Sequence, residues 1–261
     1  MRPLRGVVRR TAFLALPLVS IFTHVPPGRL VAQLSNGAVT DALVVSLKTT
    51  LVAQELVLLF GTPTAFVLAS RRFPGRSLLV TLVELPLVLP PAVAGIGLLA
   101  AFGRAGLLHT SLPFTQTAVI LAVAFVSSPL YVRQAIAAFE AVDPNLVAAS
   151  RTLGAGPVRT FFRVVLPLAR GGLAAGEALA FARGLGEFGA TIMFAGSLRG
   201  VTQTLPLAVY AEFDVNFTIA LAISALLVLI SGALLLTFKL VLLWQPSRPT
   251  SGSRFALSTS S

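Results

Sequence analysis

Four charged side chains stand inside otherwise apolar stretches of the sequence, and they are the first candidates for chemistry. Lys48 and Glu55 are seven residues apart, about two turns of an α-helix, so both side chains fall on one face. Arg183 and Glu187 are four residues apart, close enough to pair along one helix. Because an ionisable group in an apolar environment is costly, each either neutralises a partner or serves a charged solute. Both interpretations stay open for Arg183 and Glu187, and Lys48 could also extend its charge to a membrane surface.

Other kinds of chemistry are poorly represented in the sequence. The chain has no cysteine and two histidines, His24 and His109, and its carboxylates are scattered along the chain. Thiol chemistry and disulfides are therefore excluded, and neither a Cys/His metal site nor a catalytic cluster is expected. The phosphate-binding pattern GxxxxGK[ST] of ATP-hydrolysing proteins is also absent from the sequence. We therefore predict no catalytic site, no metal site and no cofactor bound by this chain.

The composition indicates the environment that must surround these charges. Hydrophobic residues make up 56% of the 261 residues, charged residues 11%, and the mean hydropathy is +0.89. Soluble domains carry about 25% charged residues, so the composition is typical of a membrane protein. The net charge of +11 does not indicate a nucleic-acid partner, because the arginines lie between apolar segments and form no basic face.

The apolar segments predict an all-α integral membrane protein, a polytopic bundle of about six transmembrane helices. The first segment is short and follows a basic run, so a retained span, a cleaved signal peptide and a surface helix all stay open, and five spans remain an alternative. We expect a basic segment at 1–10, one membrane domain at 11–244 and a disordered Ser/Pro/Thr-rich tail at 245–261. The predicted spans are residues 11–23, 43–69, 77–102, 114–139, 171–195 and 217–243.

The distribution of lysine and arginine predicts the orientation of the spans. Between the spans, one side of the membrane holds only Arg29, Arg104 and Arg199, whereas the other side holds most of the remaining basic residues. Basic residues favour the cytoplasmic side, so both termini are expected in the cytoplasm. The longest connection on that side is the loop 140–169, which is the natural surface for a soluble partner.

The loop 140–169 has the pattern of a helix, a glycine turn and a second helix. Asp143 is a suitable N-cap for a helix that begins at Pro144, and Gly154 can end that helix in the left-handed conformation. Pro157 can begin the second helix, which is expected to end where Pro167 leads into the next span. A connector that lies on the membrane and contacts anionic lipid is the alternative.

The spacing of Gly154, Val164 and Leu166-Pro167 resembles the EAA loop of the permeases of binding-protein-dependent ABC importers. In that family the loop forms a coupling helix that docks into a cleft of the ATP-binding subunit. Ala148-Ala149-Ser150 stands where Glu-Ala-Ala is usual, which puts one polar contact of that interface in doubt. The coupling residues that the resemblance implies are Ala148, Ala149, Ser150, Arg151, Thr152, Leu153, Gly154, Ala155 and Pro157.

Four further segments narrow the resemblance to the permeases of molybdate importers, with tungstate and sulfate importers as close alternatives. These segments are FPGR at 73–76, LPLVLPPAVAGIGLL at 85–99, ARGLGEFGATIMFAG at 182–196 and TQTLPLAVY at 202–210. The resemblance implies a type I ABC importer permease fold, a location in the cell (inner) membrane and a second copy of the chain as partner. It also implies ATP-binding subunits that hold the ATP and Mg, and an extracytoplasmic oxyanion-binding protein, for which the segment 202–210 is a candidate surface. An ion-coupled carrier is the less favoured alternative.

A doubly charged oxyanion needs donors along its path that do not bind it too tightly. Lys48, Arg183 and Glu187 are the charged candidates for this path, and four hydroxyl residues within the spans are candidates for its wall: Thr49, Ser127, Ser128 and Thr191. The alternative for the hydroxyl groups is a hydrogen bond to the backbone of their own helix. Pro86, Pro90 and Pro91 favour bends in the third span, which could shape packing or supply a pivot.

Overall fold

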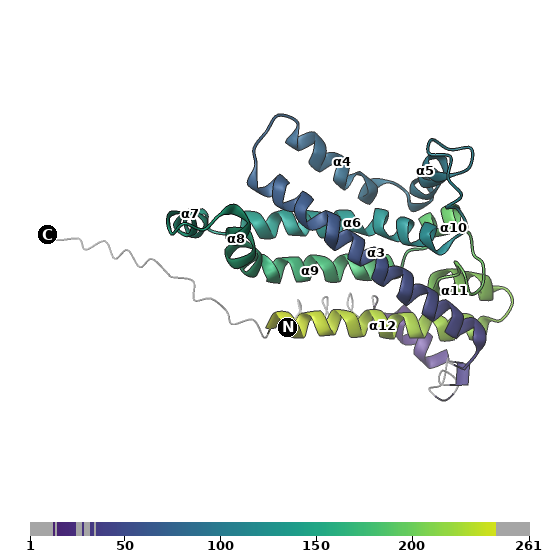
Figure 1. The fold of residues 1–261 in the computed structure, drawn as a ribbon. Helices are drawn as coiled ribbons and strands as arrows, with labels where there is room; N and C mark the ends of the chain where they lie inside the picture. Colours follow the sequence, from purple (N-terminus) through teal and green to yellow (C-terminus); the bar gives the residue numbers. More distant parts are fainter. Residues whose placement is uncertain (1–12, 14, 25–27, 29–31, 34, 244–261) are drawn as a thin grey trace.

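The computed structural model describes residues 13, 15–24, 28, 32–33 and 35–243, and over these residues the chain forms helices joined by turns, with no strand (Figure 1). The predicted segments 1–10 and 245–261 lie outside the described residues. The long helices are α3 (Gly37–Ser70), α6 (Gln116–Glu140), α9 (Leu166–Leu185) and α12 (Phe217–Leu243). The shorter ones are α4 (Arg76–Val88), α5 (Pro91–Phe102), α7 (Pro144–Thr152), α8 (Pro157–Thr160), the π-helical turn η1 (Phe161–Val165), α10 (Gly189–Ala195) and α11 (Leu205–Phe213).

Four helices of the described part are long and apolar enough to cross a membrane, and a fifth span is added if the bent pair α4 and α5 is counted as one. The predicted all-α membrane fold is therefore confirmed. The predicted first span coincides with an apolar helix at Ala15–His24. A helix of that length reaches only about 15 Å, half of the roughly 30 Å of hydrocarbon, and nearly all the residues before it lie outside the described part. A first span at 11–23 therefore stays a prediction.

The helix α3 is the central element of the bundle. It begins at Gly37 and extends for 34 residues, and the side chain of the N-cap Asn36 accepts a hydrogen bond from the amide of Ala38. At about 1.5 Å per residue it is roughly 50 Å long, more than the hydrocarbon thickness. Its residues take part in all three apolar cores: one with α5, α6 and α10, one with α6, η1 and α9, and one with α11 and α12. Residues of α3 therefore connect the other spans.

The predicted third span is bent sharply at its prolines. The helices α4 and α5 are bent by 114° at the break between them. Pro90 precedes α5 and Pro91 occupies its first turn, where a proline costs no hydrogen bond. The expected bend is therefore confirmed. Figure 1 shows α4 and α5 together on one side of the bundle, with α12 on the other.

The predicted fifth span, 171–195, is wrong in its limits and in its continuity. A continuous helical segment begins at Pro157, passes through η1 and ends at Leu185, and a separate helix α10 follows after Gly186, Glu187 and Phe188. The second helix of the loop therefore does not end at Pro167. Pro167 is tolerated because it falls in the first turn of α9, directly after the wider π-helical turn.

Candidate functional site

The connection between α6 and η1, residues 141–160, is called the α7 loop here. The Asp143 side chain accepts a hydrogen bond from the Asn145 amide at 2.8 Å, which caps α7 as expected. At the other end, Gly154 adopts a positive φ of 81°, and the amide of Ala155 donates to the Ser150 carbonyl at 3.0 Å. A glycine is favoured there because a side chain would strain this backbone conformation. The predicted helix and glycine turn are therefore confirmed.

The α7 loop presents apolar side chains outside the packed bundle. No residue of α7 is buried, and Leu153, at its end, is 87% exposed. Leu146 and Val158 are also exposed. Of the predicted coupling residues, Ala148, Ala149, Arg151, Thr152, Gly154 and Pro157 are exposed, whereas Ala155 and Ser150 are half-buried. Such a protruding apolar surface is typical of a contact with another protein.

At the break after α9, Arg183 and Glu187 form an ion pair. The distance between Arg183 Nη1 and Glu187 Oε2 is 2.5 Å, and the Glu187 side chain is 1% exposed. Its other oxygen accepts a hydrogen bond from the Ala190 amide in the first turn of α10, at 2.7 Å. The two residues do pair as the spacing predicts, but Glu187 lies beyond the end of α9. The ion pair therefore links the end of α9 to the segment before α10. The prediction that both residues lie along one helix is wrong.

The two interrupted spans contact each other at α5 and α10. A Cβ atom placed on Gly95 would lie 2.6 Å from the Ala190 carbonyl oxygen, and one on Gly189 would lie 2.7 Å from Pro91 Cβ. Such distances leave no room for a side chain, so both glycines allow a close approach of the backbones. The breaks of the third and fifth spans therefore lie against each other.

Lys48 and Glu55 share one face of α3 as predicted, and both side chains are exposed. Val44 and Leu51, which lie on the same face, are 62% and 52% exposed. Two charges thus lie on a face of a long apolar helix that no other described helix covers. Such a face either contacts another subunit or lines a polar path.

The four candidate hydroxyl residues lie mainly inside the subunit. Thr49, Ser127 and Thr191 are 0% exposed. Thr49 donates to the Val45 carbonyl of its own helix at 2.7 Å, so its hydroxyl group bonds to the helix backbone instead of facing an anion path. Ser128 also donates to its own helix, at 3.4 Å to the Phe125 carbonyl. The buried hydroxyl groups do not reach the surface of this subunit.

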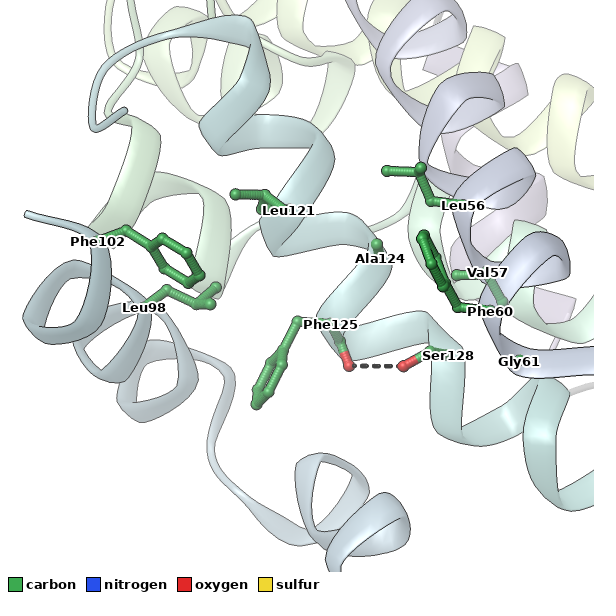
Figure 2. Close-up of a pocket in the computed structure, with 10 residues that line it drawn as sticks. All are labelled: Leu56, Val57, Phe60, Gly61, Leu98, Phe102, Leu121, Ala124, Phe125 and Ser128. Atoms are coloured by element: carbon green, nitrogen blue, oxygen red, sulfur yellow. Dashed lines mark hydrogen bonds between the residues drawn. The ribbon is translucent and has the colours of Figure 1, made fainter. Parts of the chain in front are cut away.

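Figure 2 shows a cavity of about 330 Å³ between α3, α5 and α6, and Ser128 lies at its edge. Its wall is otherwise apolar, with Phe60, Phe102 and Phe125 as its largest side chains. It offers no cationic group to an oxyanion. This cavity is therefore not an anion site.

Reasoning from the sequence missed two polar residues in the spans. The Gln54 side-chain amide donates to Ser127 Oγ and to the Ala180 carbonyl, both at 3.2 Å, and so joins α3, α6 and α9. Glu177, on α9, has a buried carboxylate oxygen that finds no hydrogen-bond partner among the described residues. Glu177 could have been found by the same search for charges in apolar stretches that identified Glu187. Gln54 carries no charge, so that search could not have found it.

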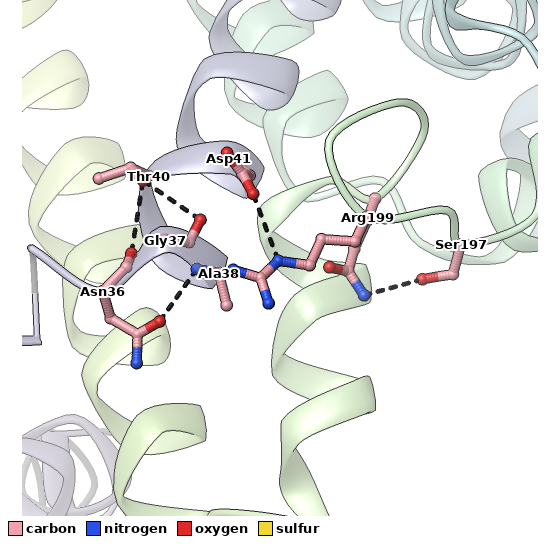
Figure 3. Close-up of polar contacts among 8 residues, drawn as sticks. Asn36, Gly37, Ala38, Thr40, Asp41, Ser197 and Arg199 are labelled. Atoms are coloured by element: carbon pink, nitrogen blue, oxygen red, sulfur yellow. Dashed lines mark hydrogen bonds and ion pairs between the residues drawn. The ribbon is translucent and has the colours of Figure 1, made fainter.

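At the opposite end of the bundle, the segment after α10 is fastened to α3 (Figure 3). Arg199 Nε lies 3.3 Å from Asp41 Oδ2. The Leu205 amide also donates to Ser46 Oγ at 2.7 Å. In the predicted docking segment 202–210, five side chains are buried: Thr202, Thr204, Leu205, Leu207 and Ala208. The exposed part of this region is the turn 198–201 that precedes it, together with Tyr210 and its neighbours. In the part of the chain that the structure describes, no cluster of side chains suits a metal ion.

The sequence was compared with protein families and with known proteins. Residues 61–244 match the family model described as binding-protein-dependent transport system inner membrane component. The molybdenum transport system permease protein ModB of Mycobacterium bovis is 42% identical over 231 residues, which cover 86% of this chain and 88% of that protein. The ModB protein of Escherichia coli K12 is 44% identical over 178 residues, 65% of this chain and 78% of that protein.

Solved structures share the fold. A bacterial alginate ABC transporter, in complex with an alginate pentasaccharide-bound periplasmic protein, matches with a TM-score of 0.69 at 16% identity over 91% of each chain. The inward-facing MetNI methionine ABC transporter matches with a TM-score of 0.63 at 20% identity, over 78% of this chain and 94% of that one. The spans, the protruding α7 loop and these neighbours define a multi-pass membrane permease with the type I ABC importer fold. The chain belongs to the family of binding-protein-dependent transport system inner membrane components.

Proposed function

We propose that this chain is the membrane-spanning subunit of an ATP-driven importer for molybdate. The observation that carries the proposal is the protruding α7 loop, whose exposed Leu153 has no function within the packed bundle. The names of the relatives support molybdate as substrate. Tungstate and sulfate are the alternatives, because they share the charge and the tetrahedral shape of molybdate.

The α7 loop is the docking element for a separate ATP-binding subunit. That subunit holds the ATP and Mg, since this sequence contains no GxxxxGK[ST] pattern. Its clefts would receive the exposed residues of the loop, and movements of the two subunits would be coupled there. An extracytoplasmic binding protein supplies the oxyanion at the opposite end of the bundle. The excess of basic residues on the side of the α7 loop supports a cytoplasmic position for this loop and for both termini.

A second copy of the chain completes the path. The apolar helix α4 has no buried residue, and Leu78, Leu82, Leu85 and Val88 are exposed along it. A surface of this kind, on the side of the bundle opposite α12, suits contact with an identical subunit as well as with lipid. The anion route then follows the interface, and the exposed Lys48 and the partly exposed Arg183 are its candidate cationic groups among the described residues.

The experiment that tests this function compares two exposed leucines at opposite ends of the molecule. Leu153→Asp places a charge at the tip of the α7 loop, and Leu107→Asp places the same charge on a leucine that is 84% exposed at the other end. Both variants should fold, because neither side chain is packed. We expect Leu153→Asp to lose the co-purifying ATP-binding subunit and the ATP hydrolysis that a molybdate-loaded binding protein stimulates, while Leu107→Asp retains the subunit. Equal retention by both variants would contradict docking at this loop.

A further inference from the structure

Three phenylalanine rings meet where the α7 loop joins the spans. Phe66 is on α3, Phe139 is on α6 and Phe161 begins η1. The ring centroids of Phe66 and Phe161 are 4.6 Å apart at an interplanar angle of 62°, and those of Phe66 and Phe139 are 5.5 Å apart at 78°. Edge-to-face contacts of this kind have a preferred geometry, so the rings resist sliding past one another. These three residues are called the aromatic junction.

The α7 loop is attached directly to the aromatic junction. The hydroxyl groups of Ser150 on α7 and Thr160 on α8 lie 3.0 Å apart, and Thr160 is 3% exposed. Phe161 follows Thr160 in the chain, and Val147 of α7 packs against the same apolar core as Phe161. A displacement of α7 must therefore displace Phe161 or break these contacts.

Beyond the junction the connection continues into the spans without a flexible segment. The Leu166 amide donates to the Phe161 carbonyl, which closes the π-helical turn, and the helix then extends to Leu185. On the other side of the junction, Arg76 at the start of α4 donates to the Leu68 carbonyl of α3 and to Glu140 of α6, both at 2.6 Å. The start of α4 is thus fastened to α3 and α6 beside the junction.

We propose that the aromatic junction is the rigid link that carries a displacement of the α7 loop into α3, α6 and α9, with Phe161 as its positioning residue. The inference rests on the proposed function, because it needs a soluble subunit that moves the loop. It goes further by assigning transmission to three side chains that lie outside the exposed docking surface. Helical π-turns are frequent at functional sites, and this one places Phe161 at the point where loop and span join.

The test is a double-mutant cycle in the assembled complex. Phe161→Leu and Phe66→Leu keep an apolar side chain but remove the ring contact. Phe60→Leu is the matched control, because Phe60 lies on α3 like Phe66 but is 65% exposed and outside the junction. Each variant is co-purified with the ATP-binding subunit, and hydrolysis is measured with and without a molybdate-loaded binding protein. We expect both junction variants to retain the bound subunit and basal hydrolysis while each loses a measurable part of the stimulation. The double variant should lose no more than either single variant, and Phe60→Leu should behave as wild type.

Wild-type stimulation in Phe161→Leu or Phe66→Leu would overturn the inference, as would additive losses in the double variant. Phe66 lies on α3, whereas Phe161 directly follows the α7 loop in the chain, so Phe66→Leu decides the question even if Phe161→Leu does not assemble. If the wild-type chain captures no ATP-binding subunit, the proposed function fails first and the inference falls with it. If the wild-type complex is stimulated and Phe66→Leu is stimulated equally, only the inference fails.

Discussion

At the scale of single residues, Glu187 balances two sources of positive charge. Its carboxylate pairs with Arg183 and also caps the first turn of α10. A helix N-terminus carries a partial positive charge, so the carboxylate is stabilised there. The consequence is that Glu187 already balances part of the positive charge that the partly exposed Arg183 would present to an oxyanion. A path with such balanced groups can pass an anion without holding it tightly.

Replacing Arg183 should therefore destabilise the protein more than replacing an arginine of an exposed ion pair. In Arg183→Met the carboxylate of Glu187, which is 1% exposed, loses its counterion. We expect the free energy of unfolding to fall by about 3–5 kcal/mol. The control is Arg199→Met, because Arg199 and Asp41 are 57% and 45% exposed, and such pairs contribute about 0–1 kcal/mol. Thermal unfolding of the purified variants in detergent measures the difference. Equal midpoints for the two variants would show that Glu187 is balanced by other groups.

At the scale of elements, the two interrupted spans break the regular helices of the bundle and yet pack closely against each other. The third span is bent at Pro90, the fifth is interrupted at Glu187, and α5 and α10 contact each other beside these breaks. The approach depends on glycine, because Ala190 and Met193 of α10 occupy the space that a side chain at Gly95 would need. The close contact on the α5 side therefore depends on Gly95 and not on the other small residues of α5.

A pair of glycines on α5 tests this directly. Gly95→Ala should separate α5 from α10 and cost about 1–3 kcal/mol, as is usual when atoms are added to a packed interior. Gly97→Ala is the matched control on the same helix, since a Cβ there would meet no atom within 4 Å. The control should be neutral or more stable by up to about 1 kcal/mol, because alanine favours the helix. Thermal unfolding in detergent checks both variants, and a stable Gly95→Ala would mean that the two helices can move apart freely.

At the scale of the whole molecule, the two ends of the bundle differ. The apolar α7 loop protrudes at one end, and at the other end the turn 198–201 is attached to α3 by the Arg199–Asp41 ion pair. The α7 loop carries Leu153 at one end, and Leu107 and the turn 198–201 lie at the other. Between these ends α3 contacts every apolar core, so a movement at one end has a continuous packed route to the other. This arrangement suits a protein with a different soluble partner on each side of the membrane.

The absence of cysteine from the sequence makes the orientation easy to test. Single variants Leu153→Cys and Leu107→Cys place one thiol at each end of the bundle. In intact spheroplasts, a membrane-impermeant maleimide should label Leu107→Cys, whereas Leu153→Cys should react only after permeabilisation. Labelling in the opposite pattern would reverse the proposed orientation and place the α7 loop outside the cell.

The sequence by itself determined the helical membrane fold, the bend of the third span and the helix-turn structure of the α7 loop. These features depend on local properties: runs of apolar residues long enough to cross a membrane, prolines that cannot donate a hydrogen bond, and a glycine that tolerates a positive φ. Five of the six predicted spans overlap helices that cross or begin to cross the bundle, and the first, 11–23, lies partly outside the described residues.

Only the tertiary structure decided where the fifth span is interrupted, which polar side chains are buried and which apolar ones are exposed. Thr49 and Lys48 are neighbours in the sequence, yet one is buried against the bundle and the other is exposed. The aromatic junction likewise joins Phe66, Phe139 and Phe161 from three distant segments. Apolar periodicity is weak in membrane helices because both lipid and protein interior favour apolar side chains. The packing of one helix against another, rather than the sequence pattern, therefore determines which face is turned inward.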